Sequence, residues 1–468
     1  MSGDSRPASD TPALVRSLGV WDGALITIGS IIGTGIFITT GDIARVLPHP
    51  GMILLVFVVG GLLTVAGALT YAEMGVLFPR AGGQYHYLKE AYGPLWGFLF
   101  GWASFLVISS GGIATLAVGF GEYLGSFVPF FSTKNVLLRL PIGPWTWIVS
   151  GGQLAGVLAI ALISAVNYVG LREGAGVQNA VTVLKVAAMA GLVCFGFAVS
   201  APVKSELFAP LPLPLGSTSS ALCMAMIPVL WTFDGWYNLT FSAGEMRNPE
   251  RSLPWGLILG TLGTTVLYAV LNLVYFRALS VSAMAGTGRI GEAAAAALFG
   301  PIGSTLVSLA VLLSTFGCLS SSILCCSRIY LPMAQDGLFF GALARIHPRH
   351  LTPSGSIVAQ GAWSALLALS GSYEQLYTYT MFVAVLFHAA TGAAVMVLRR
   401  TRPDAPRSYR TWGYPAVPIT FILSALALVV NTLFEKPGVS CIGLGLLLLG
   451  LPAYVWWRRR SRRTTRVS

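Results

Sequence analysis

Charged residues are scarce in this chain. Only 10% of its 468 residues are Asp, Glu, Lys or Arg, whereas soluble domains carry about 25%. Apolar residues make up 55% of the chain, the mean hydropathy is +0.74, and the apolar content extends over the whole length. These values exclude a soluble globular protein and indicate a protein that crosses the membrane many times.

Cysteine is also rare, and the positions of the six cysteines argue against disulfides. All six lie in apolar segments, and none lies in a predicted outer loop. Buried thiols behave as small hydrophobic groups, and the adjacent pair Cys325-Cys326 lacks the spacing of a metal site. We therefore predict no disulfide, no metal and no cofactor.

Twelve apolar windows reach the length of about 20 residues that a membrane-spanning helix needs. We expect an all-α membrane fold with twelve transmembrane helices at 19–42, 50–77, 94–127, 145–168, 178–200, 220–243, 255–280, 300–335, 355–371, 374–398, 416–433 and 438–457. This transporter domain of 18–457 lies between a polar tail of 1–17 and a basic tail of 458–468.

The basic residues indicate how the chain sits in the membrane. The net charge is +12, and both termini on the inner side would place most of the 29 Lys and Arg residues there. This asymmetry is the positive-inside rule, so we predict that both termini are cytoplasmic and that the chain has no nucleic-acid partner. The basic tail can also touch anionic lipid.

The first span carries a break of small residues, Gly33-Thr34-Gly35. Glycine costs about 1 kcal/mol relative to alanine in a helix, and lipid tolerates broken backbone only where it lines a cavity. A half-helix beginning near Thr34 would direct free N–H groups into that cavity, where they suit a carboxylate. The alternative is a glycine zipper that only packs helices together.

The sixth span is interrupted as well. Asp234 lies in its middle, where a charge costs at least about 2.5–3.5 kcal/mol, and Gly235 permits unwinding. Interruptions at corresponding places, five spans apart, are typical of transporters built from inverted repeats. We therefore expect a 5+5 inverted repeat of 18–200 and 220–398, additional spans over 416–457, and a substrate site between the two breaks.

Two more charges lie within apolar segments. Lys185 is either held by carbonyl groups at a helix end or takes the place that other transporters give to sodium. Its nearest acceptors would be the carbonyl groups freed in the first span, and the opposite wall would include Ser320 and Ser321. Glu73, near the inner end of the second span, has a pairing role or a transport role.

Several motifs together are similar to those of the amino acid–polyamine–organocation (APC) superfamily, in its L-type amino acid transporter (LAT)-like branch. The resemblance covers about 18–452 and rests on Gly29–Phe37, Tyr71–Gly75, Phe78–Tyr85, Trp231–Trp236, Glu245–Pro254, Ser327–Tyr330, Gln335–Leu338 and Ile346–Pro348.

The resemblance implies a leucine-transporter-type fold with broken helices 1 and 6, and sodium-independent amino acid transport. It implies that N–H groups of Thr34 and Gly35 bind the substrate carboxylate, and that Trp231 gates the site. Carbonyl groups of Ile31, Trp231 and Asp234 would bind the ammonium, while Lys185 would replace sodium. The predicted substrate site comprises Ile31, Gly33, Thr34, Gly35, Trp231, Asp234 and Gly235.

One departure from the branch concerns partners. Eukaryotic members bind a glycoprotein through a cysteine in the loop between spans three and four, but 129–144 contains none. We therefore expect an amino acid substrate and the lipid bilayer as partners, and no disulfide-linked heavy chain. In this respect the chain resembles a prokaryotic stand-alone permease, which implies a location in the cell (inner) membrane.

The sequence favours a transporter of neutral amino acids that works by alternating access. Cationic substrates become plausible if the Asp234 side chain faces the pocket, and exchange and proton symport are both compatible with the residues. A membrane enzyme would need a nucleophile–base pair or a metal motif, a channel would need a continuous polar pore, and a sensor would usually carry a large soluble domain.

Overall fold

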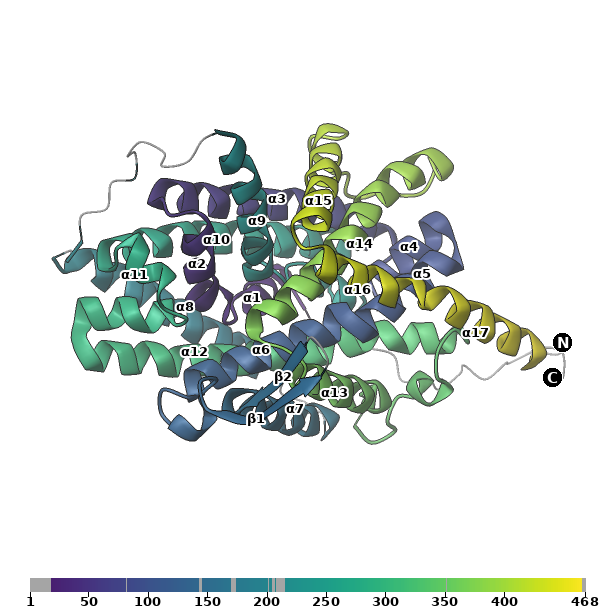
Figure 1. Cartoon of the computed structure of the whole chain (residues 1–468). Helices are drawn as coiled ribbons and strands as arrows, with labels where there is room; N and C mark the ends of the chain where they lie inside the picture. Colours follow the sequence, from purple (N-terminus) through teal and green to yellow (C-terminus); the bar gives the residue numbers. More distant parts are fainter. Residues whose placement is uncertain are drawn as a thin grey trace, which may run out of the picture.

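The computed structural model describes residues 18–80, 82–142, 145–169, 174–200, 202–203, 207, 215–350 and 352–464. The predicted tail of 1–17 lies outside the described residues. Helices account for nearly all the regular structure, and Figure 1 shows them packed together as one body.

The helices follow one another in this order: α1 (Val20–Ile31), α2 (Gly35–Val46), α3 (Pro50–Leu77), α4 (Gln84–Tyr92), α5 (Pro94–Ala103), α6 (Ser109–Leu124), α7 (Gly151–Val169), α8 (Gly174–Ala198), α9 (Leu215–Thr232), α10 (Pro249–Ala278), α11 (Val281–Ala285), α12 (Ile290–Gln335), α13 (Ser354–Ala368), α14 (Tyr373–Thr401), α15 (Ala416–Glu435), α16 (Pro437–Leu448) and α17 (Gly450–Thr464). A π-helical turn, Ser104–Ile108, joins α5 to α6. Short 3₁₀ helices lie at Pro129–Phe131, Asn238–Glu245 and Gly341–Ala344.

The described residues contain fewer helices of membrane-spanning length than the twelve predicted spans. Within the described residues, nine helices are long and apolar enough to cross a bilayer, and the pair α1–α2, bent by 46°, makes a tenth. The predicted spans at 220–243 and 355–371 correspond to shorter helices, because α9 ends at Thr232 and α13 has 15 residues. The all-helical membrane fold is thus present, and twelve spans remain a prediction.

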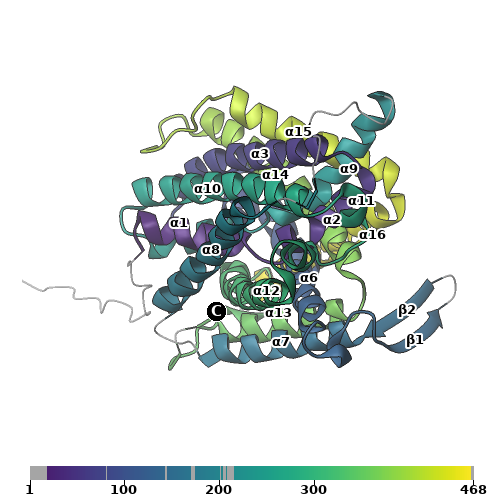
Figure 2. The same ribbon diagram turned by 90° about the vertical axis from the view of Figure 1, so that its left-hand side faces the viewer.

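One predicted boundary is wrong. The fourth span was expected to begin at residue 145, but Trp145–Ser150 forms strand β2, which pairs antiparallel with β1 (Val136–Ile142). Aromatic and β-branched residues suit a strand, and this run continues directly into the apolar α7. Figure 2 shows the hairpin projecting away from the helices. Within α12 the backbone at Gly300 is not helical, with a φ of 70°, so the residues after it form a separate helix that begins close to the predicted start of the eighth span.

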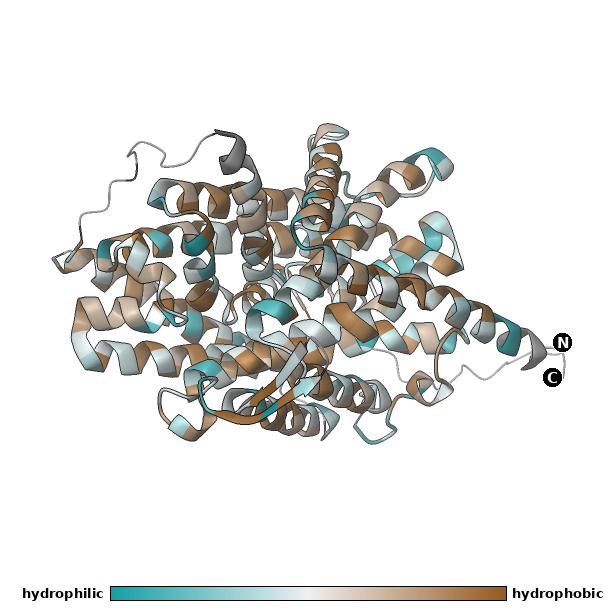
Figure 3. Cartoon of the chain, viewed as in Figure 1, coloured by the Kyte–Doolittle hydropathy of each residue, from teal (hydrophilic) through white to brown (hydrophobic). Residues whose placement is uncertain are grey.

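Distant segments meet in the centre of the fold. Helices α1, α3 and α10 lie side by side in both views (Figures 1 and 2). Glycines allow the close approach of α1 and α10, since a Cβ atom on Gly256 would lie 3.0 Å from the backbone of Gly23. Small residues support helix packing in lipid in this way. Figure 3 shows hydrophobic residues along the long helices, with hydrophilic residues mainly at their ends.

The buried carboxylate of Glu73 joins α3 to α14 and to the segment that follows it. Glu73 is 2% exposed and accepts two hydrogen bonds from Arg399 of α14, at 2.9 and 2.7 Å. It also accepts hydrogen bonds from the Thr411 backbone N–H and hydroxyl, both at 2.8 Å, and lies 3.5 Å from the Arg407 guanidinium. Glu73 therefore has the pairing role, which holds the segment after α14 against α3.

Replacing Glu73 with alanine is expected to destabilise the protein by about 3–5 kcal/mol, because two guanidinium groups would lose their buried partner. The matched control is Glu90→Ala, since Glu90 is partly exposed and pairs with Arg402 at 2.6 Å. Such surface pairs contribute about 0–1 kcal/mol. Thermal unfolding of both variants in detergent checks the difference, and equal unfolding midpoints would contradict it.

Candidate functional site

The break in the first span leaves N–H groups available at the start of α2. Thr34 is the N-cap of α2, but its side chain does not cap the helix. Its hydroxyl lies 3.0 Å from the Tyr373 hydroxyl instead. The first N–H groups of a helix have no intrahelical partner, so those of Gly35 and Ile36 remain free to bind an anion.

The carbonyl groups at the end of α1 are all contacted by other helices. Lys185 of α8 donates hydrogen bonds to Gly29 O at 2.7 Å and Ile32 O at 3.0 Å. The Cys318 thiol of α12 lies 3.2 Å from Ser30 O, and the Tyr268 hydroxyl of α10 lies 3.3 Å from Ile31 O. Each carbonyl oxygen has two lone pairs, so Ile31 O keeps the capacity to accept a substrate ammonium.

The second break follows α9, which contains Pro228 and ends at Thr232. The Asp234 N–H donates to Trp231 O at 3.0 Å, and the chain then turns through Gly235, whose φ is 91°. This left-handed conformation favours glycine. A 3₁₀ helix begins at Asn238, so the sixth span has irregular backbone in its middle.

The two breaks touch each other. A Cβ atom on Gly235 would lie 2.6 Å from Ser30 O, and a Cβ atom on Gly35 would lie 2.8 Å from the Thr232 Cα. The hydroxyl groups of Thr39 and Thr232 are 2.6 Å apart. Any side chain at either glycine would therefore separate the two breaks.

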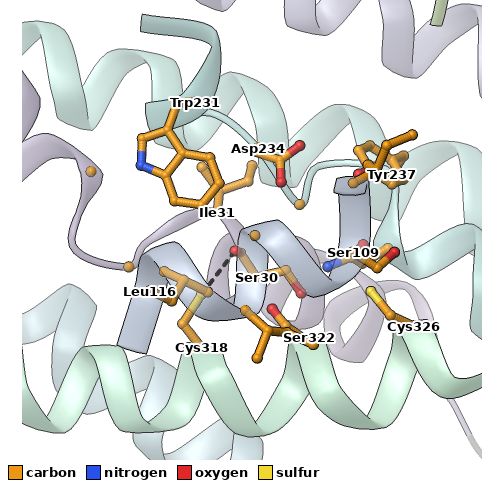
Figure 4. A pocket seen from close by; sticks show the side chains of 17 residues that line it. Ser30, Ile31, Ser109, Leu116, Trp231, Asp234, Tyr237, Cys318, Ser322 and Cys326 are labelled. Atoms are coloured by element: carbon orange, nitrogen blue, oxygen red, sulfur yellow. Dashed lines mark hydrogen bonds between the residues drawn. The ribbon is translucent and has the colours of Figure 1, made fainter. Parts of the chain in front are cut away.

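A cavity lies where the breaks meet, with α6 and α12 as its other walls (Figure 4). It leaves about 30 Å³ for water-sized molecules, which is close to the volume of one water in the liquid. An amino acid can therefore enter only when these walls separate. The lining residues are Ser30, Ile31, Gly33, Gly35, Ile108, Ser109, Gly112, Ile113, Leu116, Trp231, Asp234, Gly235, Tyr237, Asn238, Cys318, Ser322 and Cys326.

The predicted substrate residues are brought together with one difference. Ile31, Gly33, Gly35, Trp231, Asp234 and Gly235 all line the cavity. Thr34 lies beside it, because its side chain is directed to Tyr373.

An acidic group faces the cavity. Asp234 is a lining residue, and its Oδ1 atom is buried without a hydrogen-bond partner within the described residues. Tyr237 lines the same cavity. A buried, partly unsatisfied carboxylate is costly in an apolar surrounding, so this oxygen is suited to a donor on a ligand.

Sequence reasoning missed Tyr373, which links both breaks. The Trp231 indole N–H donates to the Tyr373 hydroxyl at 2.8 Å, and the same hydroxyl contacts Thr34. Tyr377, one turn further along α14, is 2% exposed and stacks on Trp231 with ring centroids 6.3 Å apart. Aromatic residues at a span end suggest an interfacial belt, and no local signal separates that role from this buried contact.

Lys185 is 4% exposed and lies between α1 and α12. Ser320 and Ser321 were expected on the opposite wall, but their hydroxyl groups hydrogen-bond elsewhere. Ser320 bonds Asn167 of α7, and Ser321 bonds Gly317 O of its own helix. Ser314 of α12 lies beside Lys185 instead, and its hydroxyl donates to Ile32 O at 3.0 Å. The polar face of α12 was correctly located, but the residue that faces Lys185 lies about two turns earlier.

No metal centre competes with this site in the described part of the chain, where no group of three or more His, Cys, Asp or Glu residues could hold a metal ion. All six cysteines are free thiols.

Comparison with known proteins agrees with this geometry. The sequence model of the amino acid permease family matches residues 18–446. The chain is 29% identical to the serine/threonine exchanger SteT of Bacillus subtilis, over 96% of this chain and 98% of SteT.

Two mammalian proteins are similar to a comparable degree. The human b(0,+)-type amino acid transporter 1 is 30% identical over 91% of this chain and 84% of its own length. The mouse large neutral amino acids transporter small subunit 2 is 28% identical over 96% of this chain and 83% of its own length. With two opposed helix breaks around a cavity and a family match over nearly its whole length, the chain belongs to the amino acid permease family.

Proposed function

We propose that the chain is a sodium-independent amino acid transporter of the cell membrane that works by alternating access. The observation that carries the proposal is the meeting of two helix breaks at one small cavity. N–H groups at the start of α2 suit a carboxylate, and carbonyl groups at the end of α1 suit an ammonium. Together, these N–H and carbonyl groups are complementary to the α-carboxylate and α-ammonium groups that all amino acids share.

The proposal includes twelve spans arranged as a 5+5 inverted repeat, with both termini in the cytoplasm. The small volume of the cavity supports alternating access, because loading an amino acid requires its walls to separate. Exchange of neutral L-amino acids is the favoured mode, and the similarity to SteT, a serine/threonine exchanger, supports it. Proton symport is the alternative mode.

Sodium independence is supported by Lys185. Its ammonium contacts Gly29 O and Ile32 O, and carbonyl groups at a broken helix are the ligands that coupling ions use in such transporters. Because the Lys185 ammonium already occupies the carbonyl oxygens of Gly29 and Ile32, a sodium ion is not needed there. Uptake in sodium buffer and in choline buffer should therefore agree, and a steep sodium dependence would refute this part of the proposal.

The experiment that tests the whole proposal is counterflow into liposomes that contain the purified protein. A panel of the twenty amino acids, with and without internal substrate and with a pH gradient, separates exchange from proton-driven uptake. Accumulation that requires internal amino acid supports exchange. Absence of counterflow for every amino acid would overturn the proposal, and a current without counterflow would indicate a channel.

A second substrate class is favoured by Asp234. Its Oδ1 atom is buried, unpaired within the described residues, and belongs to a residue that lines the cavity. A cationic side chain, or a polyamine, would supply the missing donor and a complementary charge. We therefore add cationic amino acids to the proposed substrates, alongside neutral ones.

Replacing Asp234 with asparagine is expected to discriminate between the two classes. Hydrogen bonds to charged groups contribute about 1.5–3 kcal/mol, which is roughly ten- to a hundredfold in affinity. Counterflow of arginine should fall by this factor, while counterflow of a small neutral amino acid should change less than threefold. An equal loss for both substrates would contradict a side-chain role for Asp234.

A further inference from the structure

A crevice separate from the central cavity lies beside α17, near the end of the described chain. It has a volume of about 470 Å³, far larger than the central cavity. It lies where the junction of α4 and α5, the end of α12 and the basic part of α17 meet. Its lining residues are Lys89, Tyr92, Gly93, Pro94, Leu95, Asp336, Leu338, Tyr454 and Arg458.

The acidic group in the crevice is already neutralised. Asp336 accepts hydrogen bonds from the Lys89 ammonium and from the Tyr85 hydroxyl, both at 2.5 Å. The third charged lining residue, Arg458, contacts the Tyr454 ring and forms no ion pair within the described part of the chain. The crevice therefore has an excess positive charge and a guanidinium with donors to spare.

A second hollow of about 240 Å³ adjoins the crevice, because both are lined by Tyr454 and Arg458. It adds Arg459, which is exposed and also lacks an ion pair among the described residues. Two consecutive arginines are thus available to one ligand. Guanidinium groups match the geometry of phosphate oxygens.

The surroundings place the crevice at the level of lipid headgroups. The first part of α17 is apolar and aromatic, and the helix continues into the run Arg458, Arg459 and Arg460; Figure 3 shows this change from brown to teal along the helix. Trp456 is 52% exposed and Trp96, at the start of α5, is 43% exposed. Exposed tryptophans flanking apolar helices are typical of the membrane–water interface. A ligand in the crevice can therefore have its polar part beside Arg458 and its apolar part along α5 and α17.

We propose that this crevice binds the phosphodiester headgroup of an anionic phospholipid, with Arg458 as its principal contact. Charge complementarity favours an anionic lipid, because basic segments beside a membrane helix attract the negative leaflet. Leu95, in the first turn of α5, adds an N–H group without an intrahelical partner. The inference rests on the proposed orientation, with α17 ending on the cytoplasmic side, and does not depend on which amino acid is transported.

Binding at this place would join α17 to the core. Phe98 and Trp102 of α5 already pack against Tyr454 and Trp457 of α17, with ring centroids 5.4–6.3 Å apart. A headgroup held between Lys89 and Arg458 would add a second connection between the same elements. The bound lipid should therefore raise the temperature at which the protein unfolds.

The test uses the purified full-length protein in a neutral detergent, titrated with phosphatidylglycerol or phosphatidylcholine while thermal unfolding is followed. Phosphatidylglycerol should raise the unfolding midpoint in a saturable way, and phosphatidylcholine should not. Arg458→Gln should weaken the apparent affinity at least tenfold. The matched control is Arg400→Gln, because Arg400 is an exposed arginine at the end of α14 and does not line the crevice.

Several outcomes would overturn the proposal. Equal stabilisation by both lipids would exclude headgroup recognition, and an equal loss in Arg400→Gln would indicate diffuse attraction to basic residues. Inorganic phosphate that reproduces the shift would indicate a site for a soluble anion. If Arg458→Gln does not fold, native mass spectrometry of the wild type decides, since it should retain phosphatidylglycerol and release phosphatidylcholine under the same activation. Counterflow is measured separately, so failure of either proposal can be recognised.

Discussion

Gly35→Ala is expected to weaken amino acid binding more than tenfold, by at least about 1.4 kcal/mol. A Cβ atom at this position would lie 2.8 Å from the Thr232 Cα and 3.2 Å from its Oγ1. The nearest atom is backbone, so neither partner can relieve the clash by changing rotamer. The start of α2 would have to move away from the second break, and its free N–H groups would move with it.

The control for this variant is Gly191→Ala, in α8, where an added Cβ meets nothing within 4 Å. Alanine there favours the helix over glycine, so stability and binding should be unchanged or slightly improved. Substrate binding is measured by the shift in thermal unfolding with amino acid concentration. Wild-type affinity in a folded Gly35→Ala protein would falsify the assignment of the carboxylate site.

The position of the site could be predicted from sequence because broken helices have a strong local signal. Glycine and a charged residue are both unfavourable inside a membrane span, so Gly33-Thr34-Gly35 and Asp234-Gly235 stand out without any knowledge of their neighbours. Their approach to one another followed from the rule that corresponding breaks enclose the substrate. The structure places Gly235 against Ser30 and Gly35 against Thr232.

The partners of these residues could not be predicted in the same way. Tyr373 contacts Trp231 and Thr34 across more than 140 residues of sequence, and its local context is that of any tyrosine at a span end. Ser314 and Ser320 are both serines in the apolar α12, and which of them lies beside Lys185 depends on the depth and rotation of the helix, which are set by tertiary packing. Local patterns therefore locate irregular backbone, but they do not choose between polar side chains on one helix.

The hairpin was missed for a related reason. Trp145–Ser150 is apolar enough to be read as the beginning of the next span, and only its pairing with Val136–Ile142 distinguishes it from a helix. Of the predicted outer loop, the described residues 129–142 contain a short 3₁₀ helix and strand β1. Short apolar runs are ambiguous between strand and helix, so this boundary required the structure.

Lys185→Ala is expected to abolish most transport while substrate binding falls less. The variant removes the ammonium that contacts Gly29 O and Ile32 O. Ile32 O keeps the Ser314 hydroxyl at 3.0 Å, but Gly29 O loses its partner, and an unsatisfied buried acceptor costs about 1–3 kcal/mol. The end of α1 would be less well held against α8 and α12, so conformations open to one side should accumulate.

Ser314→Ala provides the matched comparison, because it removes a neutral donor to the same carbonyl group and leaves Lys185 in place. Its expected cost is about 0.5–1.5 kcal/mol, so transport should be reduced several-fold at most. Counterflow rates in liposomes, normalised to the amount of folded protein, compare the two variants. Transport by Lys185→Ala at the wild-type rate would reject the coupling role. If exchange survives in Lys185→Ala while proton-driven uptake disappears, the lysine carries the proton, and symport replaces exchange as the mode of this transporter.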